Sequence, residues 1–444
     1  MVTDDVSRLA PVDEAIRPSD AQPDRSRSTP GTPVRRASVA FAAAGLLVGT
    51  GTPSIVYGVH IRHEPLSFET WTFSYPLNAI GLVSVLLLYR ELARTPVSAW
   101  PRPIWPLIGL VSWSLASVLW SVSPNATATR AMVAVGIAAF GVWFGRSLRF
   151  TEQLLAVAAM SLITTVGSTM LIAGWPNIGR NGLGDWQGVF GNPNSLGPAN
   201  VIAMIAAVGV WIHFPRWPAR VVAAGLGVVN LVMLTQTASI TAQAGLAVCV
   251  LTAVAVLAAR HLARVGVPGR RVAVAFGSVG VGVLILVIPN VSRIAGALGR
   301  DPTLASRTVI WSDMLRFIGD RPVQGYGYWA FWDNLDFAWV SYRDVGGYYG
   351  SAHNSFYEIA LGLGLIGVAL FSLVVLAAIG GVARGVWTDH SVAGMWWAVM
   401  LGFVLVEHLM ESFVLWHSYI WMLLVAAAFL RRDGASIDRP SSTV

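Results

Sequence analysis

The chain has 444 residues, of which 55% are hydrophobic and only 12% are charged. A typical soluble domain carries about 25% charged residues, so this composition excludes an ordinary soluble enzyme. Apolar runs of about 17–25 residues recur along the chain, which is the length a helix needs to cross about 30 Å of hydrocarbon. The sequence therefore predicts an all-α fold, a polytopic bundle of transmembrane helices.

The positive charge of the chain comes entirely from arginine. All 30 basic residues are Arg, the formal net charge is +7, and the single cysteine, Cys249, lies in an apolar run. Arginine in a membrane protein gathers in cytoplasmic loops beside anionic lipid, so we expect the lipid bilayer and not nucleic acid as the partner of this charge. A lone cysteine excludes a disulfide framework and a thiolate metal cluster.

Composition divides the chain into tails, spans and one long loop. Residues 1–38 are polar without an apolar run, which predicts a disordered tail, and residues 431–444 form a second polar tail. We expect about twelve spans, nine within residues 39–289 and three within residues 356–430. The expected helices cover residues 39–59, 73–90, 104–121, 131–148, 154–174, 194–214, 219–236, 239–259, 272–289, 356–381, 393–411 and 414–430.

Arginine placement predicts the orientation of these spans. With the N-terminus in the cytoplasm, the inner loops and adjacent tails hold seventeen arginines, whereas the short outer loops hold only Arg62, Arg130 and Arg180. This distribution satisfies the positive-inside rule. We therefore expect a multi-pass protein of the cytoplasmic (inner) membrane with both termini in the cytoplasm.

One outer segment, residues 290–355, is far longer than the other loops. Loops longer than about 15 residues are usually functional or disordered. This loop holds twelve of the chain's 46 aromatic residues, which argues against disorder, and a helix-like stretch runs from Leu304 to Ile318. We expect a large, partly helical extracytoplasmic loop between the ninth and tenth spans, and we expect it to carry the functional site.

Arginine and aromatic side chains in this loop suit an anionic ligand that bears sugar. A guanidinium binds phosphate through two parallel N–H groups, and aromatic rings pack on the C–H faces of sugars. The alternative is an interfacial aromatic belt with arginines on lipid headgroups. His353, beside Asn354 at the mouth of the tenth span, is a candidate general base. The alternative for His353 is a hydrogen-bonded interfacial residue.

Glu407, His408 and Glu411 form a second ionisable cluster near the outer end of the eleventh span. Glu407 and Glu411 share a helix face at i, i+4. Ionisable residues inside a span are costly and usually functional, which favours a site or a proton relay. A hydrated position paired with loop arginines is the alternative. The chain has no Asp-x-Asp pair, P-loop or dinucleotide-binding glycine pattern, so we expect neither a metal ion nor a cofactor.

Four stretches form an ordered series of motifs along the chain. They are Trp120-Ser-Val-Ser-Pro124; Gly188-Val-Phe-Gly-Asn-Pro-Asn194; Ser306-Arg307-Thr-Val-Ile-Trp311 with Arg321-Pro-Val-Gln-Gly-Tyr-Gly327; and Ala352-His353-Asn354 leading into Gly362, Gly364 and Gly367. Together they resemble the O-antigen ligase and O-antigen polymerase family of bacterial envelope polysaccharide assembly. The resemblance covers most of the chain after residue 39.

The resemblance implies a metal-independent glycosyltransferase that moves a glycan from a polyprenyl-diphosphate carrier to a hydroxyl acceptor at the outer face of the membrane. His353 would be the base, and Arg307 would stabilise charge on the diphosphate leaving group. A chain-length regulator or a flippase is a further implied partner. The residues expected to bind substrate are Asn354, Trp311, Arg316, Arg293, Arg180, Tyr349 and Glu411.

One position departs from the family pattern. The family often has a basic residue at the start of the eighth span, where this chain has Ile240 within Ala238-Ser-Ile-Thr-Ala242. Because Ile240 cannot bind phosphate, two readings stay open. Either another arginine, such as Arg180, Arg293 or Arg316, supplies this charge, or the donor is different.

The leading expectation is a polysaccharide polymerase that moves the growing chain onto the next lipid-linked repeat unit. A ligase that transfers finished glycan to a terminal acceptor is the close alternative. From another class, a proton-coupled solute transporter would use the cluster at residues 407–411 and would predict inverted repeats, which the sequence does not show. A different polytopic glycosyltransferase would use Glu64 or Glu69 in the first outer loop.

Overall fold

The computed structural model describes residues 33–52, 71–267, 307–334, 350–388, 392–413 and 418–431. Throughout these ranges the secondary structure is helical, and the one extended pairing is a single β-bridge between Arg180 and Trp186. The all-α fold class predicted from composition is confirmed.

Seven of the described helices are long and apolar enough to cross a membrane. They are α5 (Pro124–Ser147), α6 (Phe150–Gly174), α8 (Pro193–His213), α9 (Trp217–Gln236), α10 (Ile240–Arg264), α15 (Ser355–Thr388) and α16 (Val392–Met410). Four more helices overlap predicted spans: α1 (Pro33–Gly49), α3 (Trp71–Leu92), α4 (Ile104–Ala116) and α17 (Tyr419–Ala428). Helix α1 begins at Pro33, inside the segment 1–38 that the composition predicts as a disordered tail. The predicted span at 272–289 lies outside the described residues.

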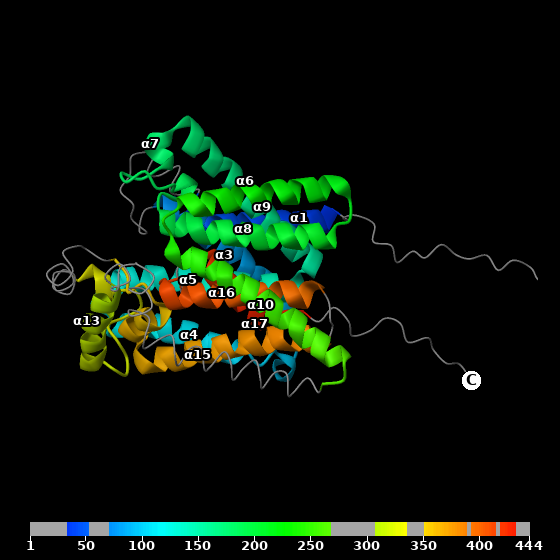
Figure 1. Ribbon diagram of the computed structural model, residues 1–444. Helices are drawn as coiled ribbons and strands as arrows, with labels where there is room; N and C mark the ends of the chain where they lie inside the picture. The colour runs from blue at the N-terminus through cyan, green and yellow to red at the C-terminus, as the bar shows by residue number, and fades with distance from the viewer. Residues whose placement is uncertain are drawn as a thin grey trace, which may run out of the picture.

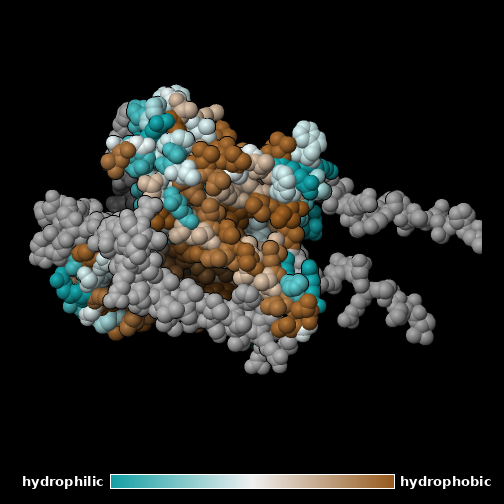
Figure 2. Space-filling view, viewed as in Figure 1, coloured by the Kyte–Doolittle hydropathy of each residue, from teal (hydrophilic) through white to brown (hydrophobic). Residues whose placement is uncertain are grey.

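The long helices lie side by side as a bundle, and two short helices occupy the same end of it (Figure 1). These are α7 (Pro176–Gly179) and α13 (Arg307–Asp320), and α13 lies across the bundle axis. Hydrophobic residues cover the middle of the face seen in Figure 2, and hydrophilic residues gather towards the two ends. Apolar side chains that point outward along a bundle indicate that lipid is the surrounding solvent.

The centre of the bundle is α17. Each of its residues from Tyr419 to Ala428 is buried, as expected for a helix that is hydrophobic on all sides. Small residues let neighbouring backbones come close: a Cβ placed on Gly145 of α5 would lie 2.4 Å from the carbonyl oxygen of Ala426. Close packing through glycine and alanine is how helices associate in a membrane, where the lipid provides little hydrophobic drive.

A break in α15 anchors the loop that carries α13. Gly364 has φ 65° and ψ −165°, a conformation open essentially to glycine alone, and it interrupts the helix. A segment of the large loop packs into this break and forms hydrogen bonds with the helix backbone. The N–H of Leu365 donates to the Pro322 carbonyl (2.8 Å), and the N–H of Tyr326 donates to the Leu361 carbonyl (2.8 Å). Backbone groups that the break releases are therefore satisfied by the loop, as a membrane protein requires.

The stretch after α4 holds the other side of this loop. The indole N–H of Trp120 donates to the Gln324 carbonyl (3.0 Å), and the backbone N–H of Val122 donates to the Tyr326 carbonyl (3.0 Å). The Trp120–Pro124 motif and the Arg321–Gly327 motif, about two hundred residues apart, thus form one structural unit. This unit fixes the position of α13 at the end of the bundle.

Candidate functional site

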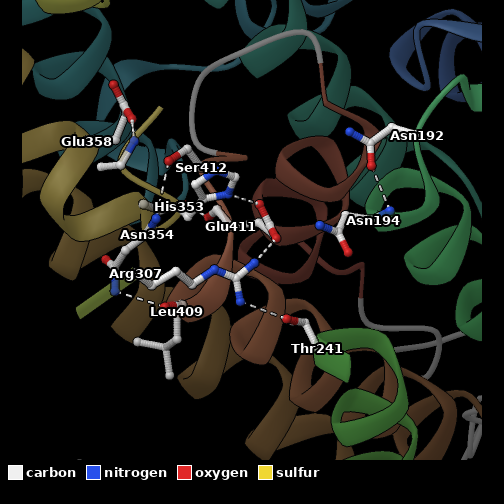
Figure 3. Close-up of polar contacts among 12 residues, drawn as sticks. Asn192, Asn194, Thr241, Arg307, His353, Asn354, Glu358, Leu409, Glu411 and Ser412 are labelled. Carbon is white, nitrogen blue, oxygen red and sulfur yellow. Dashed lines mark hydrogen bonds and ion pairs between the residues drawn. The ribbon is translucent and has the colours of Figure 1, made fainter. Parts of the chain in front are cut away.

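Arg307, His353 and Glu411 meet at the end of the bundle that carries α13 (Figure 3). Arg307 is the first residue of α13, His353 precedes α15, and Glu411 follows α16. Nδ1 of His353 lies 2.7 Å from Oε2 of Glu411, and Nη2 of Arg307 donates to Oε1 of the same carboxylate. One carboxylate therefore holds both the candidate base and the candidate cation.

Thr241, in the first turn of α10, is a fourth member of this cluster. Nη1 of Arg307 donates to its hydroxyl oxygen at 3.1 Å. Sequence reasoning missed Thr241, because the family pattern drew attention to the lost basic residue at Ile240, whose side chain is exposed. The eighth predicted span does reach the site, through the neighbouring position.

The backbone at His353 is held in an unusual conformation. His353 has φ 48°, in the left-handed region that residues other than glycine rarely adopt and that often marks functional positions. The buried carboxylate of Glu358 accepts from the N–H of Ala352 (2.8 Å) and from the indole of Trp332 (2.7 Å), while the indole of Trp311 donates to the Ala352 carbonyl (2.9 Å). These contacts hold the backbone of Ala352 on both sides and thereby stabilise the unusual conformation of His353.

Asn354 joins the start of α15 to the end of α16. Its Nδ2 donates to the carbonyl of Leu409 in α16 (2.8 Å), and its Oδ1 accepts from the N–H groups of Phe356 (2.8 Å) and Tyr357 (3.2 Å), as a helix N-cap does. The amide predicted to bind substrate therefore also caps α15 and ties it to α16, next to Glu411.

The hydrogen bond between His353 and Glu411 determines the tautomer of the imidazole. A carboxylate only accepts, so Nδ1 carries the proton and donates it to Glu411, which leaves the lone pair of a neutral ring on Nε2. The side chain of His353 is 28% exposed, whereas those of Arg307 and Glu411 are 13% and 10% exposed. The base thus reaches solvent, while its charged partners lie in a poorly hydrated environment where charges interact more strongly.

Several loop aromatics form a core of their own. The ring of Phe317 packs edge-on against the rings of Phe331 and Tyr326, with centroids 5.1 and 6.5 Å apart. Burial raises the pKa of Tyr326, the nearby Asp320 raises it further, and its hydroxyl donates to the Phe317 carbonyl (3.1 Å). These buried aromatic residues pack against α13 and support it. The sequence had suggested a different role for the loop aromatics, either sugar binding or an interfacial belt.

The other predicted binding residues lie in different places. Trp311 is one turn from Arg307, and its ring stacks on Tyr357 with centroids 5.7 Å apart. Arg316 is exposed, nine positions and hence half a rotation from Arg307 on α13, with its guanidinium over Phe317. The guanidinium of Arg180 lies 5.8 Å from the Trp186 ring. Arg293 and Tyr349 lie outside the described residues, as do Glu64 and Glu69.

The predicted 407–411 cluster divides between two environments. Glu411 joins the site, whereas Glu407 and His408 are buried inside the bundle. Nδ1 of His408 lies 2.8 Å from the hydroxyl of Ser355, the first residue of α15. Within the described ranges, no group of three or more His, Cys, Asp or Glu side chains is arranged to hold a metal ion.

A family model and a curated protein are both similar to this chain. Residues 225–372, which include α10, Arg307 and His353, match a family model described as O-antigen ligase. The exopolysaccharide production protein ExoQ of Rhizobium meliloti (strain 1021) is 24% identical over 353 residues, covering 73% of this chain and 76% of that protein. The resemblance predicted from the sequence motifs is confirmed: this multi-pass membrane protein is similar to proteins of the O-antigen ligase and O-antigen polymerase family.

Proposed function

We propose that this protein is a polysaccharide polymerase. It transfers a glycan from a polyprenyl-diphosphate carrier to a sugar hydroxyl of the next lipid-linked repeat unit, at the outer face of the cytoplasmic membrane. The observation that carries the proposal is the double contact of Glu411, which holds His353 as a base and Arg307 as a cation side by side. In glycosyl transfer from a diphosphate, a base can activate the acceptor hydroxyl and a cation can stabilise the leaving group.

In the proposed reaction His353 activates the acceptor. Nε2 takes the proton of the acceptor hydroxyl as its oxygen attacks the anomeric carbon of the donor sugar. The bond between that carbon and the phosphate oxygen breaks, and its electron pair leaves on the polyprenyl diphosphate. Glu411 stabilises the imidazolium that forms, in the way a carboxylate does in a hydrolase triad.

In the same proposed reaction, Arg307 stabilises the leaving group. Negative charge grows on the diphosphate as the bond to sugar breaks, and a preoriented guanidinium stabilises that charge without reorganisation. Contacts to Thr241 and Glu411 hold the guanidinium in place. In this proposal the guanidinium supplies the charge that a divalent metal supplies in other glycosyltransferases.

A ligase is the second candidate, because the matched family model is described as O-antigen ligase. The name of the similar protein ExoQ refers to exopolysaccharide production, which favours a polymerase. Both activities use the same donor and the same chemistry, and they differ in the acceptor. A flippase that delivers the donor and a regulator of chain length are the partners that either activity would meet in the membrane.

The test uses purified protein in lipid nanodiscs with a polyprenyl-diphosphate-linked oligosaccharide. A gel that resolves glycan length separates the outcomes. A polymerase produces a ladder from the lipid-linked unit alone. One discrete addition, seen only with a separate acceptor, would replace the polymerase by a ligase, and no product from a donor validated with another enzyme would refute both.

A further inference from the structure

Glu407 is a buried carboxyl group that the proposed mechanism leaves unused. It lies on α16, four residues before Glu411, and its side chain is fully buried. Neither carboxyl oxygen has a hydrogen-bond partner within the part of the chain that the structure describes. Buried polar groups without partners are rare in native proteins and each calls for a physical explanation.

Four titratable or charged side chains interact electrostatically with Glu407. They are Arg307 of α13, Glu411 at the end of α16, Cys249 of α10 and Tyr419 of α17. Among the described residues, the hydroxyl of Tyr419 is also buried without a hydrogen-bond partner. Of the four, only Arg307 carries positive charge.

The packing brings α10 close to this carboxyl. A Cβ placed on Gly245 would lie 3.7 Å from Oε1 of Glu407 and 2.6 Å from the Phe403 ring. Glu407 is therefore enclosed by protein, and an ionised carboxylate there would lose its hydration without gaining hydrogen bonds. Such a charge costs several kcal/mol unless a partner compensates it, and Arg307 is already paired with Glu411.

We propose that Glu407 is a positioning residue that works in its uncharged acid form and determines how much positive charge Arg307 presents to the diphosphate of the donor. This inference rests on the proposed function, in which Arg307 contacts the diphosphate. With Glu407 uncharged, one carboxylate faces one guanidinium. Ionisation of Glu407 would place two carboxylates against that guanidinium, draw it into the bundle and oppose binding of the anionic donor.

The inference predicts a specific effect of pH on the wild-type protein. As Glu407 loses its proton, the fraction of protein competent to bind donor falls, and the apparent KM for the donor rises towards a limit of about tenfold per pH unit. The turnover number of the bound complex changes little, because the reacting groups are the same. Glu407→Gln has no proton to lose, so its KM for the donor stays flat over the same range.

Infrared spectroscopy tests the charge state without any substrate. The spectrum of wild-type protein minus that of Glu407→Gln is expected to show the C=O band of a protonated carboxyl that shifts in D2O. Glu411→Gln, the matched control on the same helix face, keeps this band. If Glu407→Gln does not fold, Glu407→Met supplies a side chain of similar length that suits an apolar interior, and the comparison is unchanged.

The two measurements separate the inference from the function on which it rests. A difference spectrum without the carboxyl band in an active protein would refute the inference and leave the proposed function standing. A KM for the donor that rises equally with pH in wild type and in Glu407→Gln would also refute it. Protein that shows the band but transfers no glycan from a validated donor would refute the proposed function, and the inference with it.

Discussion

Nδ1 of His353 lies 2.7 Å from Oε2 of Glu411, although 58 residues separate them in the chain. The sequence showed these residues as parts of two separate clusters, one at the mouth of the tenth span and one at the end of the eleventh. Their contact unites the clusters and gives the imidazole a fixed orientation.

Glu411→Gln should lower the turnover number for glycan transfer by about 10²–10⁴-fold. An amide can still accept a hydrogen bond from Nδ1 of His353, but it cannot stabilise an imidazolium by charge. The comparison is made with Glu91→Gln, which removes a carboxylate paired with Arg146 at the opposite end of the bundle and should leave turnover unchanged. Wild-type turnover in a folded Glu411→Gln protein would contradict the orienting role.

Arg307→Ala should lower kcat/KM for the donor by about 10²–10³-fold, because the leaving diphosphate loses its preoriented cation. Arg307→Lys keeps the charge but not the planar pair of donors, so it should recover only part of the activity. The control is Arg316→Ala, which removes an exposed arginine from the opposite face of the same helix. Equal losses from Arg307→Ala and Arg316→Ala would indicate a general effect of charge on the loop.

Gly364→Ala should destabilise the protein by roughly 1–3 kcal/mol or more. The new Cβ would lie 2.2 Å from the Val323 carbonyl oxygen, in a backbone conformation that alanine cannot adopt without strain. Thermal unfolding in detergent measures the effect. Gly380→Ala lies on the same helix with nothing within 4 Å of its Cβ, so it should unfold at the wild-type temperature. Equal unfolding temperatures for the two variants would contradict the account of the break.

Ser312→Cys should react with a membrane-impermeant thiol reagent added to intact cells, because Ser312 is exposed on α13, at the end of the bundle that the arginine distribution predicts to face outward. The single native cysteine, Cys249, is buried and should stay unlabelled. His261→Cys, an exposed position at the other end of α10, should react only after lysis. The reverse pattern would invert the predicted orientation.

Much of the fold could be predicted from the sequence, because apolar run length is a direct signal of membrane helices. The predicted span at 219–236 coincides with α9, which begins at Trp217, and the helix-like stretch after Leu304 is α13. The break at Gly364 could not be predicted, since glycines are common inside membrane helices. Its conformation depends on a loop segment that is distant in the sequence and reaches Gly364 only in the folded protein.

The candidate site was predictable only in part. Arg307 and His353 stood out through motif spacing, and the structure brings them to one carboxylate. Thr241 carried no signal, because a threonine at the start of a span is ordinary. Asn354 stood out beside His353, but its capping role depends on the Leu409 carbonyl, and the sequence does not show that α16 ends there.

Transfer of glycan by wild-type protein and by His353→Gln, from the same polyprenyl-diphosphate-linked donor, tests the central claim most directly. Glutamine occupies a similar volume but cannot accept a proton near neutral pH. His261→Gln, on the last turn of α10, is the matched control. We predict a full ladder from wild type and from His261→Gln, and at least about 10²-fold less product from folded His353→Gln protein. A wild-type ladder from His353→Gln would contradict the assignment of His353 as the base.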